Sequence, residues 1–459
     1  TSTAGFVGLA ERGPIEGLPQ LVTNFSDFKR KYGGYLSENE FGEYRFLAYA
    51  VEHFFINGGA RCYISRVAPS DAKCASAQIP SENKAALVLT AKNPGMWGNN
   101  IRAVISPASK AKTQVLEIVE NASGKKYVVK NGSGFQPGDI VSFTDGKKTS
   151  YNRVVKNQDN LLEFEKEFEE DVVDKNLVPK KLISTCEFTL EVRYDDLAEV
   201  YENVSFNIEA PNYIEKKTAK SELITAACAG VGSEILAPFD ELAAEGDAVV
   251  SVSFTGGSNG SVASLSAADF IGYDNGASRR SGIQSFLDND VVSIMAVPGV
   301  TDPNVQLTLV AHCENLGSRF AVLDMPRDAK KVDDILAHRD ILDSSYAALY
   351  HPWLQVFDPL DKKNFAIPPS GSIMGIYARS DNSRGVHKAP ANEVVRACVG
   401  LDCQFNKGEQ DILNPKGVNL IRAFPGMGIR VWGARTASSD PSWKYINVRR
   451  LFIFIEESI

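Results

Sequence analysis

Three aspartates stand at positions where a carboxylate could do acid–base chemistry. Asp302, Asp324 and Asp358 each lie near the C-terminal end of an expected strand, and in open α/β sheets ligands bind at that edge. A carboxylate there could act as a general acid or base, so one open interpretation is an α/β enzyme with a carboxylate site. The other is structural: all three begin proline-containing segments typical of turns, and we favour it.

A serine in a glycine-rich segment is a second candidate for chemistry. Ser258 lies in Gly256–Gly260, a Gly-x-Ser-x-Gly match that follows the apolar segment Val249–Phe254. A nucleophile elbow requires the serine to stand on a sharp turn that opens directly into a helix. Here Ser261–Ser264 intervene, and a helical pattern begins only near Ser266. We therefore expect a glycine-rich turn and no nucleophile.

Other signatures of cofactor or metal chemistry are absent from the sequence. There is no P-loop, no Gly-x-Gly-x-x-Gly and no His-Glu-x-x-His motif. The seven cysteines are scattered without a Cys-x-x-Cys pair, so we expect reduced, mostly buried thiols. His387 lies in a polar loop with no identifiable partner, and we expect it to form a hydrogen bond only. The sequence predicts no cofactor and no metal.

Charge and hydropathy exclude two classes of partner. The net charge is −8, whereas a nucleic-acid binder needs a basic face to displace counterions. No stretch approaches 18 uninterrupted apolar residues, which a membrane-spanning helix would need. We expect neither nucleic-acid binding nor direct membrane insertion.

Helical and strand patterns alternate at both ends of the chain. Phe46–Asn57 has apolar residues at helical spacing, Gly58-Gly59 ends it, and Cys62–Val67 alternates as a strand does. In residues 251–459 we expect helices at Ser281–Asp288, Val305–Leu316 and Val332–Leu342, and strands at Val291–Val297, Phe320–Asp324 and Ala347–Phe357. Such alternation indicates βαβ units. The sequence predicts one α/β core with a mixed, largely parallel sheet, formed by residues 1–100 and 251–459.

The middle of the chain has a different pattern of expected secondary structure. Residues 101–250 hold short apolar strands separated by turn pairs such as Asn131-Gly132 and Asp145-Gly146. Within them, Gln114–Phe168 is typical of a small five-stranded barrel. We therefore expect a multidomain protein whose β-rich middle region is inserted into the α/β core.

Several rigid segments punctuated by glycine and aromatic residues occur in a specific order. They are Asn57–Tyr63, Pro94–Asn100, Gly256–Gly260, Tyr350–Trp353, Pro368–Asn392 and Asn414–Thr436. In this order and spacing they resemble the tail sheath proteins of contractile phages, R-type bacteriocins and extracellular contractile injection systems. The resemblance covers roughly residues 4–100 and 251–459; the middle is only loosely similar, as expected of a variable, outward-facing part.

The resemblance implies a structural protein and not an enzyme. Subunits of this family stack as six-fold rings in a helical sleeve, assembled in the bacterial cytoplasm, that becomes part of a virion tail or a released particle. The implied partners are further copies of the chain, an inner tube protein, and baseplate and terminator proteins. A contractile sleeve without a nucleotide site must store the energy for contraction during assembly, so its extended state is expected to be metastable. A non-contractile tail or capsid building block remains an alternative.

Relatives implied by the resemblance are longer than this chain. They continue past Asn447–Glu457 and carry an arm before the equivalent of Thr1. We therefore expect the C-terminal family portion, the linking arms and the tube-contacting surface to lie outside these residues.

Five arginines gather near the end of the chain: Arg422, Arg430, Arg435, Arg449 and Arg450. In a contractile sleeve they are candidates for interface ion pairs that exchange partners on contraction. The alternative is that most of them pair within the fold or face solvent, and the sequence leaves both possibilities open.

Overall fold

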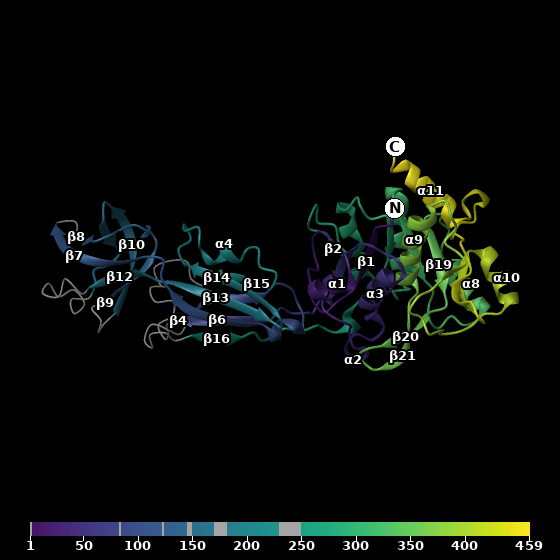
Figure 1. The fold of residues 1–459 in the computed structure, drawn as a ribbon, viewed down its shortest axis with the longest axis horizontal. Coiled ribbons are helices and arrows are strands. Elements are labelled where there is room, and N and C mark those ends of the chain that lie inside the picture. The colour runs from purple at the N-terminus through teal and green to yellow at the C-terminus, as the bar shows by residue number, and fades with distance from the viewer. Residues whose placement is uncertain (1, 82–83, 122–123, 145–148, 169–180, 229–248) are drawn as a thin grey trace. The chain divides into compact units, whose positions relative to one another are not determined.

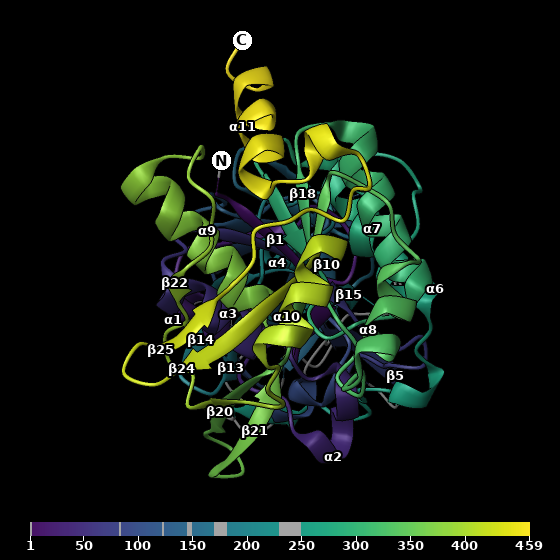
Figure 2. The same cartoon turned by 90° about the vertical axis from the view of Figure 1, so that its right-hand side faces the viewer.

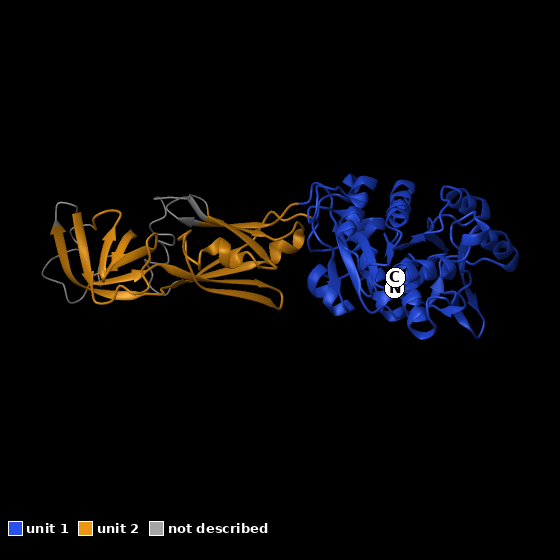
Figure 3. Cartoon of the chain, turned by 90° about the horizontal axis from the view of Figure 1, so that it is seen from above, with its two compact units in different colours: residues 1–72, 259–459 blue, residues 73–258 orange. Residues whose placement is uncertain are grey.

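The chain divides into two compact units, which are coloured separately in Figure 3. The computed structural model describes residues 2–459 except 82–83, 122–123, 145–148, 169–180 and 229–248. Unit 1 comprises Thr1–Ala72 and Asn259–Ile459, and unit 2 comprises Lys73–Ser258. The inserted unit therefore begins earlier than the expected residue 101 and ends later than residue 250. The reason is that β5 (Lys84–Ala91) pairs with β4 (Ser76–Ser81) and β15 (Ile224–Cys228) and not with the core sheet.

Unit 1 is built on a nine-stranded mixed sheet (Figure 1). Six neighbouring strands pair in parallel in the order β3 (Cys62–Val67), β1 (Ala4–Leu9), β17 (Ile294–Ala296), β18 (Phe320–Asp324), β19 (Ala347–His351) and β24 (Val418–Phe424). Antiparallel strands flank them: β2 (Gln20–Val22) at one edge, β25 (Gly428–Val431) and β22 (Glu393–Val394) at the other. The mixed sheet expected from the sequence is confirmed.

Helices cover both faces of this sheet (Figure 2). Alternate residues of β18 show why: Phe320 and Val322 belong to the core beneath one group of helices, and Ala321 and Leu323 to the core beneath the other. The first group is α1 (Phe25–Tyr32), α3 (Leu47–Asn57) and α9 (Ser370–Arg384); the second is α7 (Pro303–Leu316), α8 (Val332–Arg339) and α10 (Lys407–Leu413). A strand buried on both faces reads as a continuous apolar run, as β18 does.

Helices α3 and α9 approach each other unusually closely. A Cβ atom on Gly371 would lie 2.3 Å from the Ala50 carbonyl oxygen, and one on Gly375 would lie 2.4 Å from that of Phe54. Only glycine fits where two backbones approach so closely. This contact explains two glycines of the Pro368–Asn392 segment, and it fixes α9 over the sheet.

Two expected elements of unit 1 differ in detail. The expected helix at Ser281–Asp288 is the 3₁₀ helix Gly282–Asp288. The expected strand Ala347–Phe357 is two strands, β19 and β20 (Leu354–Asp358), because Pro352 has no N–H to donate to a ladder. Strand β20 leaves the main sheet and pairs with β21 (Lys363–Ile367) and β23 (Gly400–Leu401).

Unit 2 contains two small sheets and a closed barrel. One sheet has the order β14 (Leu197–Val204), β13 (Glu187–Tyr194), β6 (Arg102–Ala108) and β16 (Val250–Ser253), and the other is β15-β5-β4. The barrel comprises β7 (Lys112–Asn121), β8 (Gly124–Val129), β9 (Ile140–Thr144), β10 (Thr149–Gln158), β11 (Leu161–Phe164) and β12 (Leu182–Thr185). The expected barrel of five strands was therefore wrong by one: β12 closes it by pairing with both β7 and β9.

We predict that the barrel can be removed without unfolding the rest of the chain. Its ends are adjacent, since the Thr185 N–H donates to the Ala111 carbonyl at 2.9 Å. Joining Ala111 to Cys186 by a short loop should therefore leave cooperative thermal unfolding by circular dichroism. The matched control deletes only Gln114–Phe168. This deletion leaves β12 without its pairing strands and should broaden the unfolding transition. Loss of cooperativity in the first variant would show that the core depends on the barrel.

Candidate functional site: strand-end carboxylates and C-terminal arginines

The strand-end carboxylate of Asp324 caps a helix. Asp324 is the last residue of β18 and is 2 % exposed. Its oxygens accept hydrogen bonds from the Ser370 N–H at 2.8 Å, the Ser370 hydroxyl at 2.7 Å and the Gly299 N–H at 3.0 Å. Burial raises the pKa of Asp324 to about 6, and these hydrogen bonds oppose the rise. Because Ser370 begins α9, the carboxylate satisfies an N-terminal amide of that helix, and its lone pairs are already engaged.

The other two aspartates serve different local structures. Asp302 is exposed and is the N-cap of α7, where it accepts from the Asn304 N–H at 2.8 Å. Asp358 ends β20, is fully buried, and accepts from Arg45 at 3.1 Å and from the Tyr49 hydroxyl at 2.9 Å. Among the described residues the three carboxylates share no hydrogen-bond partner. The structure therefore assigns them to capping and ion pairing and does not bring them together.

The segment around Ser258 is a clamped turn. Gly256 and Gly260 have positive φ angles of 82° and 70°. The backbone of Gly257 is held by Asn99, which donates to its carbonyl at 2.9 Å and accepts from its N–H at 2.8 Å. The following short helix α6 (Ala267–Ile271) begins only after Ser266. The expectation of a glycine-rich turn is confirmed.

The two arginines of the C-terminal helix α11 (Ile446–Glu456) are engaged within the fold. Arg450 is 5 % exposed and makes a bidentate ion pair with Asp381, at 3.0 and 2.5 Å. The Ser2 hydroxyl donates to the same carboxylate at 2.8 Å. Arg449 is also buried; it donates to the Ser345 hydroxyl at 2.9 Å and lies 3.5 Å from the centre of the Trp443 ring.

The other three arginines have no carboxylate partner among the described residues. Arg422 and Arg430 lie directly opposite each other on β24 and β25. Arg422 lies over the Phe424 ring at 5.2 Å, and Arg430 donates to the Asn392 carbonyl at 2.9 Å. Arg435 lies over the Tyr445 ring at 5.2 Å. The five sequence-predicted arginines therefore separate into a buried pair and a partly exposed group.

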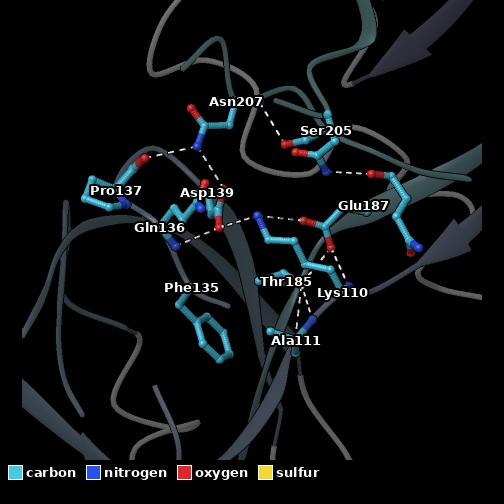
Figure 4. Close-up of polar contacts among 12 residues, drawn as sticks. Lys110, Ala111, Phe135, Gln136, Pro137, Asp139, Thr185, Glu187, Ser205 and Asn207 are labelled. Carbon is cyan, nitrogen blue, oxygen red and sulfur yellow. Dashed lines mark hydrogen bonds and ion pairs between the residues drawn. The ribbon is translucent and has the colours of Figure 1, made fainter. Parts of the chain in front are cut away.

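A buried polar cluster in unit 2 was not predicted from the sequence (Figure 4). The Lys110 amine lies 2.8 Å from a carboxylate oxygen of Asp139 and 3.6 Å from one of Glu187. Asp139 also accepts from the Asn207 amide at 2.8 Å. Thr185 completes the cluster by donating to Glu187 at 2.6 Å. The cluster joins the barrel to the neighbouring strands, and no local pattern could reveal it because its members are far apart in sequence.

The described cysteines, histidines and helices could in principle form a disulfide, a metal site or a membrane-spanning segment. The seven cysteines, all among the described residues, form no disulfide. His387 is exposed, and its carbonyl accepts from the Asn447 amide at 3.0 Å. Within the described ranges, no three His, Cys, Asp or Glu side chains are grouped so as to hold a metal ion. No helix that the structure describes has the length and apolar character needed to cross a membrane.

Comparison with known proteins finds similarity to phage tail sheath proteins. Residues 281–437, all in unit 1, match the family model described as the phage tail sheath protein central domain. The tail sheath protein of Salmonella phage ViI is 27% identical over 209 residues, which cover 39% of this chain and 32% of that protein. A putative prophage major tail sheath protein of Pseudomonas aeruginosa (strain UCBPP-PA14) is 24% identical over 260 residues, or 54% of this chain and 65% of that protein.

A solved structure agrees in fold. The sheath tail protein of Listeria innocua superposes with a TM-score of 0.55 at 9% identity, covering 100% of this chain and 75% of that one. The chain spans 32% and 65% of the lengths of the two sequence relatives above. Residues 281–437 are therefore similar in sequence to the central domain of phage tail sheath proteins, and the chain is similar in fold to a solved sheath tail protein.

Proposed function

We propose that this chain is a structural sheath subunit that polymerises into a helical contractile sleeve around an inner tube. The observation that carries the proposal is the match of residues 281–437 to the tail sheath central domain. The sleeve is assembled in an extended, metastable form and shortens to drive the tube through a target envelope. Its energy is stored at assembly as the difference between two packings of the same subunits.

The chemistry of unit 1 supports a mechanical role. Asp302, Asp324 and Asp358 cap helices or hold an arginine, so each has a structural use. The α3–α9 contact through Gly371 and Gly375 favours a core that moves as one body. In the assembled sleeve, changes would then concentrate at contacts between subunits, where a head-to-tail interface that does not close yields a helical polymer.

The partners and the placement of the chain follow from the same proposal. Copies of the chain form six-fold rings, and the sleeve contacts an inner tube protein, a baseplate and a terminator. Unit 2 faces outward, and assembly takes place in the bacterial cytoplasm before the sleeve joins a virion tail or a released particle. Arg422, Arg430, Arg435, Arg449 and Arg450 are proposed interface residues whose ion pairs change on contraction.

Electron microscopy of the full-length gene product, co-expressed with its tube protein, tests the proposal. Striated sleeves of two lengths are the expected result. Sleeves or tubes of one length under every condition would instead support a non-contractile tail building block. Absence of any ordered polymer would overturn the sheath assignment.

We also predict that assembled sleeves hydrolyse no nucleotide. The sequence has no phosphate-binding loop, and the strand-end carboxylates are occupied by helix and arginine donors. A phosphate-release assay on purified sleeves should therefore equal the buffer background. Turnover that disappears in the Asp324→Asn or Ser258→Ala variant would support the enzyme alternative.

A further inference from the structure

One face of the β24–β25 hairpin combines aromatic and cationic side chains. Arg422 and Arg430 are directly opposite residues of the antiparallel pair, so they project from the same face. Phe424 lies two residues beyond Arg422 on that face, and its ring centre is 4.5 Å from that of Trp432. All four side chains are partly exposed. We call Arg422, Phe424, Arg430 and Trp432 the hairpin face.

The two charges of the hairpin face are not compensated inside the described part of the chain. Like charges directly opposite each other on two strands destabilise the pair. Neither guanidinium makes an ion pair with another described residue, in contrast to Arg450, which pairs with Asp381. The two guanidinium groups are therefore available to carboxylates outside the hairpin.

The hairpin face is also held in place before any partner binds. The Arg430 guanidinium donates to the carbonyls of Asn392 and Met427, at 2.9 and 3.0 Å, and Arg422 rests on Phe424. These contacts reduce the side-chain entropy that binding would otherwise cost. The Trp432 indole N–H has no protein partner among the described residues and is a further donor.

This composition selects the chemistry of the partner. Arginine forks bind carboxylates in a bidentate manner, and tryptophan and arginine dominate the energetics of protein interfaces. The tip of the hairpin adds apolar contact area through Met427, which is 48% exposed, and the edge strand β22 adds Val394 at 38%. The matching surface is therefore a protein surface that bears carboxylates beside apolar groups.

The acidic net charge of the chain favours a second copy of the chain as that partner. The chain carries 57 acidic against 49 basic residues, so copies repel one another on average unless a local cationic surface meets an acidic one. We propose that the hairpin face of one copy binds carboxylates of a second copy. This inference rests on the proposed sheath function and narrows the five candidate arginines to Arg422 and Arg430 as the pair available for contact between subunits.

Zero-length cross-linking tests this contact directly. In the variant Arg422→Lys with Arg430→Lys, the charges are kept and each amine can be joined to a neighbouring carboxylate by a carbodiimide. Assemblies made from mixed isotopically heavy and light chains should yield peptides that join Lys at these positions in one chain to Asp or Glu of another. Cross-links found only within one chain, or only to the tube protein, would overturn the proposal.

Charge reversal gives an independent readout. The double variant Arg422→Glu with Arg430→Glu should lower the fraction of chain in sedimentable assemblies by about tenfold. The matched control, Arg384→Glu with Lys407→Glu, makes the same change in net charge at exposed positions of unit 1 and should assemble normally. Circular dichroism melting of both variants establishes that the chain is folded. Normal assembly of the hairpin variant would exclude the contact.

These outcomes separate the contact from the proposed function. If the wild-type chain forms sleeves and the hairpin variants assemble equally well, the proposed contact is excluded and the proposed sheath function stands. If cross-links form between chains but sleeves of two lengths are not seen, the proposed contact stands and the proposed contractile function is excluded.

Discussion

Replacement of Lys110 by methionine is expected to destabilise unit 2 by about 3–5 kcal/mol, the usual cost of leaving a buried charge without its partner. Asp139 is 1% exposed and Glu187 is 4% exposed, and the Lys110 amine is the cation beside both. Removal of the amine leaves two buried carboxylates near each other without the cation that they share. Chemical denaturation followed by fluorescence or circular dichroism measures the loss as a shift of the unfolding transition.

A matched control and a pH series make this test specific. Lys125→Met removes an amine that pairs with the exposed Glu167, and its unfolding transition should coincide with that of the wild type. Burial already raises the pKa of Glu187, and loss of Lys110 raises it further. The native variant therefore holds a proton that the unfolded chain releases, so its deficit relative to wild type should grow as pH rises and shrink toward pH 5. Equal stability of the two lysine variants would contradict a role for the cluster.

Replacement of Arg450 by methionine should destabilise unit 1 by a similar amount, about 3–5 kcal/mol. The side chains of Arg450 and Asp381 are 4% and 2% exposed, and the variant leaves Asp381 buried without its bidentate partner. The Ser2 hydroxyl, which also donates to Asp381, cannot supply the missing charge. Denaturation curves of the two proteins provide the measurement.

Two companion variants decide how that loss arises. Arg422→Met removes an arginine that lacks a carboxylate partner among the described residues, so we expect a change within about 0.5 kcal/mol. The double variant Arg450→Met with Asp381→Leu removes both charges and should recover most of the loss, because an apolar pair can replace a buried ion pair. Failure of the double variant to recover would show that Asp381 is needed for its other hydrogen bonds.

Local patterns in the sequence predicted the elements that depend on local rules. Cys62–Val67 was expected with the bounds observed, and α3 was expected with a start one residue earlier. Both segments have regular apolar spacing, and Gly58 and Gly59 separate them. Asp302 was expected to begin a turn or cap, and it is the N-cap of α7.

Features that depend on distant residues were missed. The sixth barrel strand, Leu182–Thr185, is short and is separated from β11 by a charged segment, so only its pairing with β7 and β9 identifies it as part of the barrel. The partner of Arg450 lies 69 positions away, and the partner of the Lys110 backbone lies 77 positions away. Sequence spacing carries no information about such contacts, which form only when the tertiary fold brings the residues together.

The order of strands in unit 1 has a consequence for folding during synthesis. Strands β1 and β3 leave the ribosome early and pair with each other, but the next strand of the sheet, β17, lies beyond the whole of unit 2. At 5–20 residues per second, translation of that unit takes roughly 10–40 s. Throughout that interval β1 lacks the 3₁₀ helix Gly282–Asp288 that later packs against it, whereas unit 2 has all its strands as soon as its own translation ends. The inserted unit should therefore fold first, and the nascent first strands of unit 1 are the segment for which a chaperone would compete.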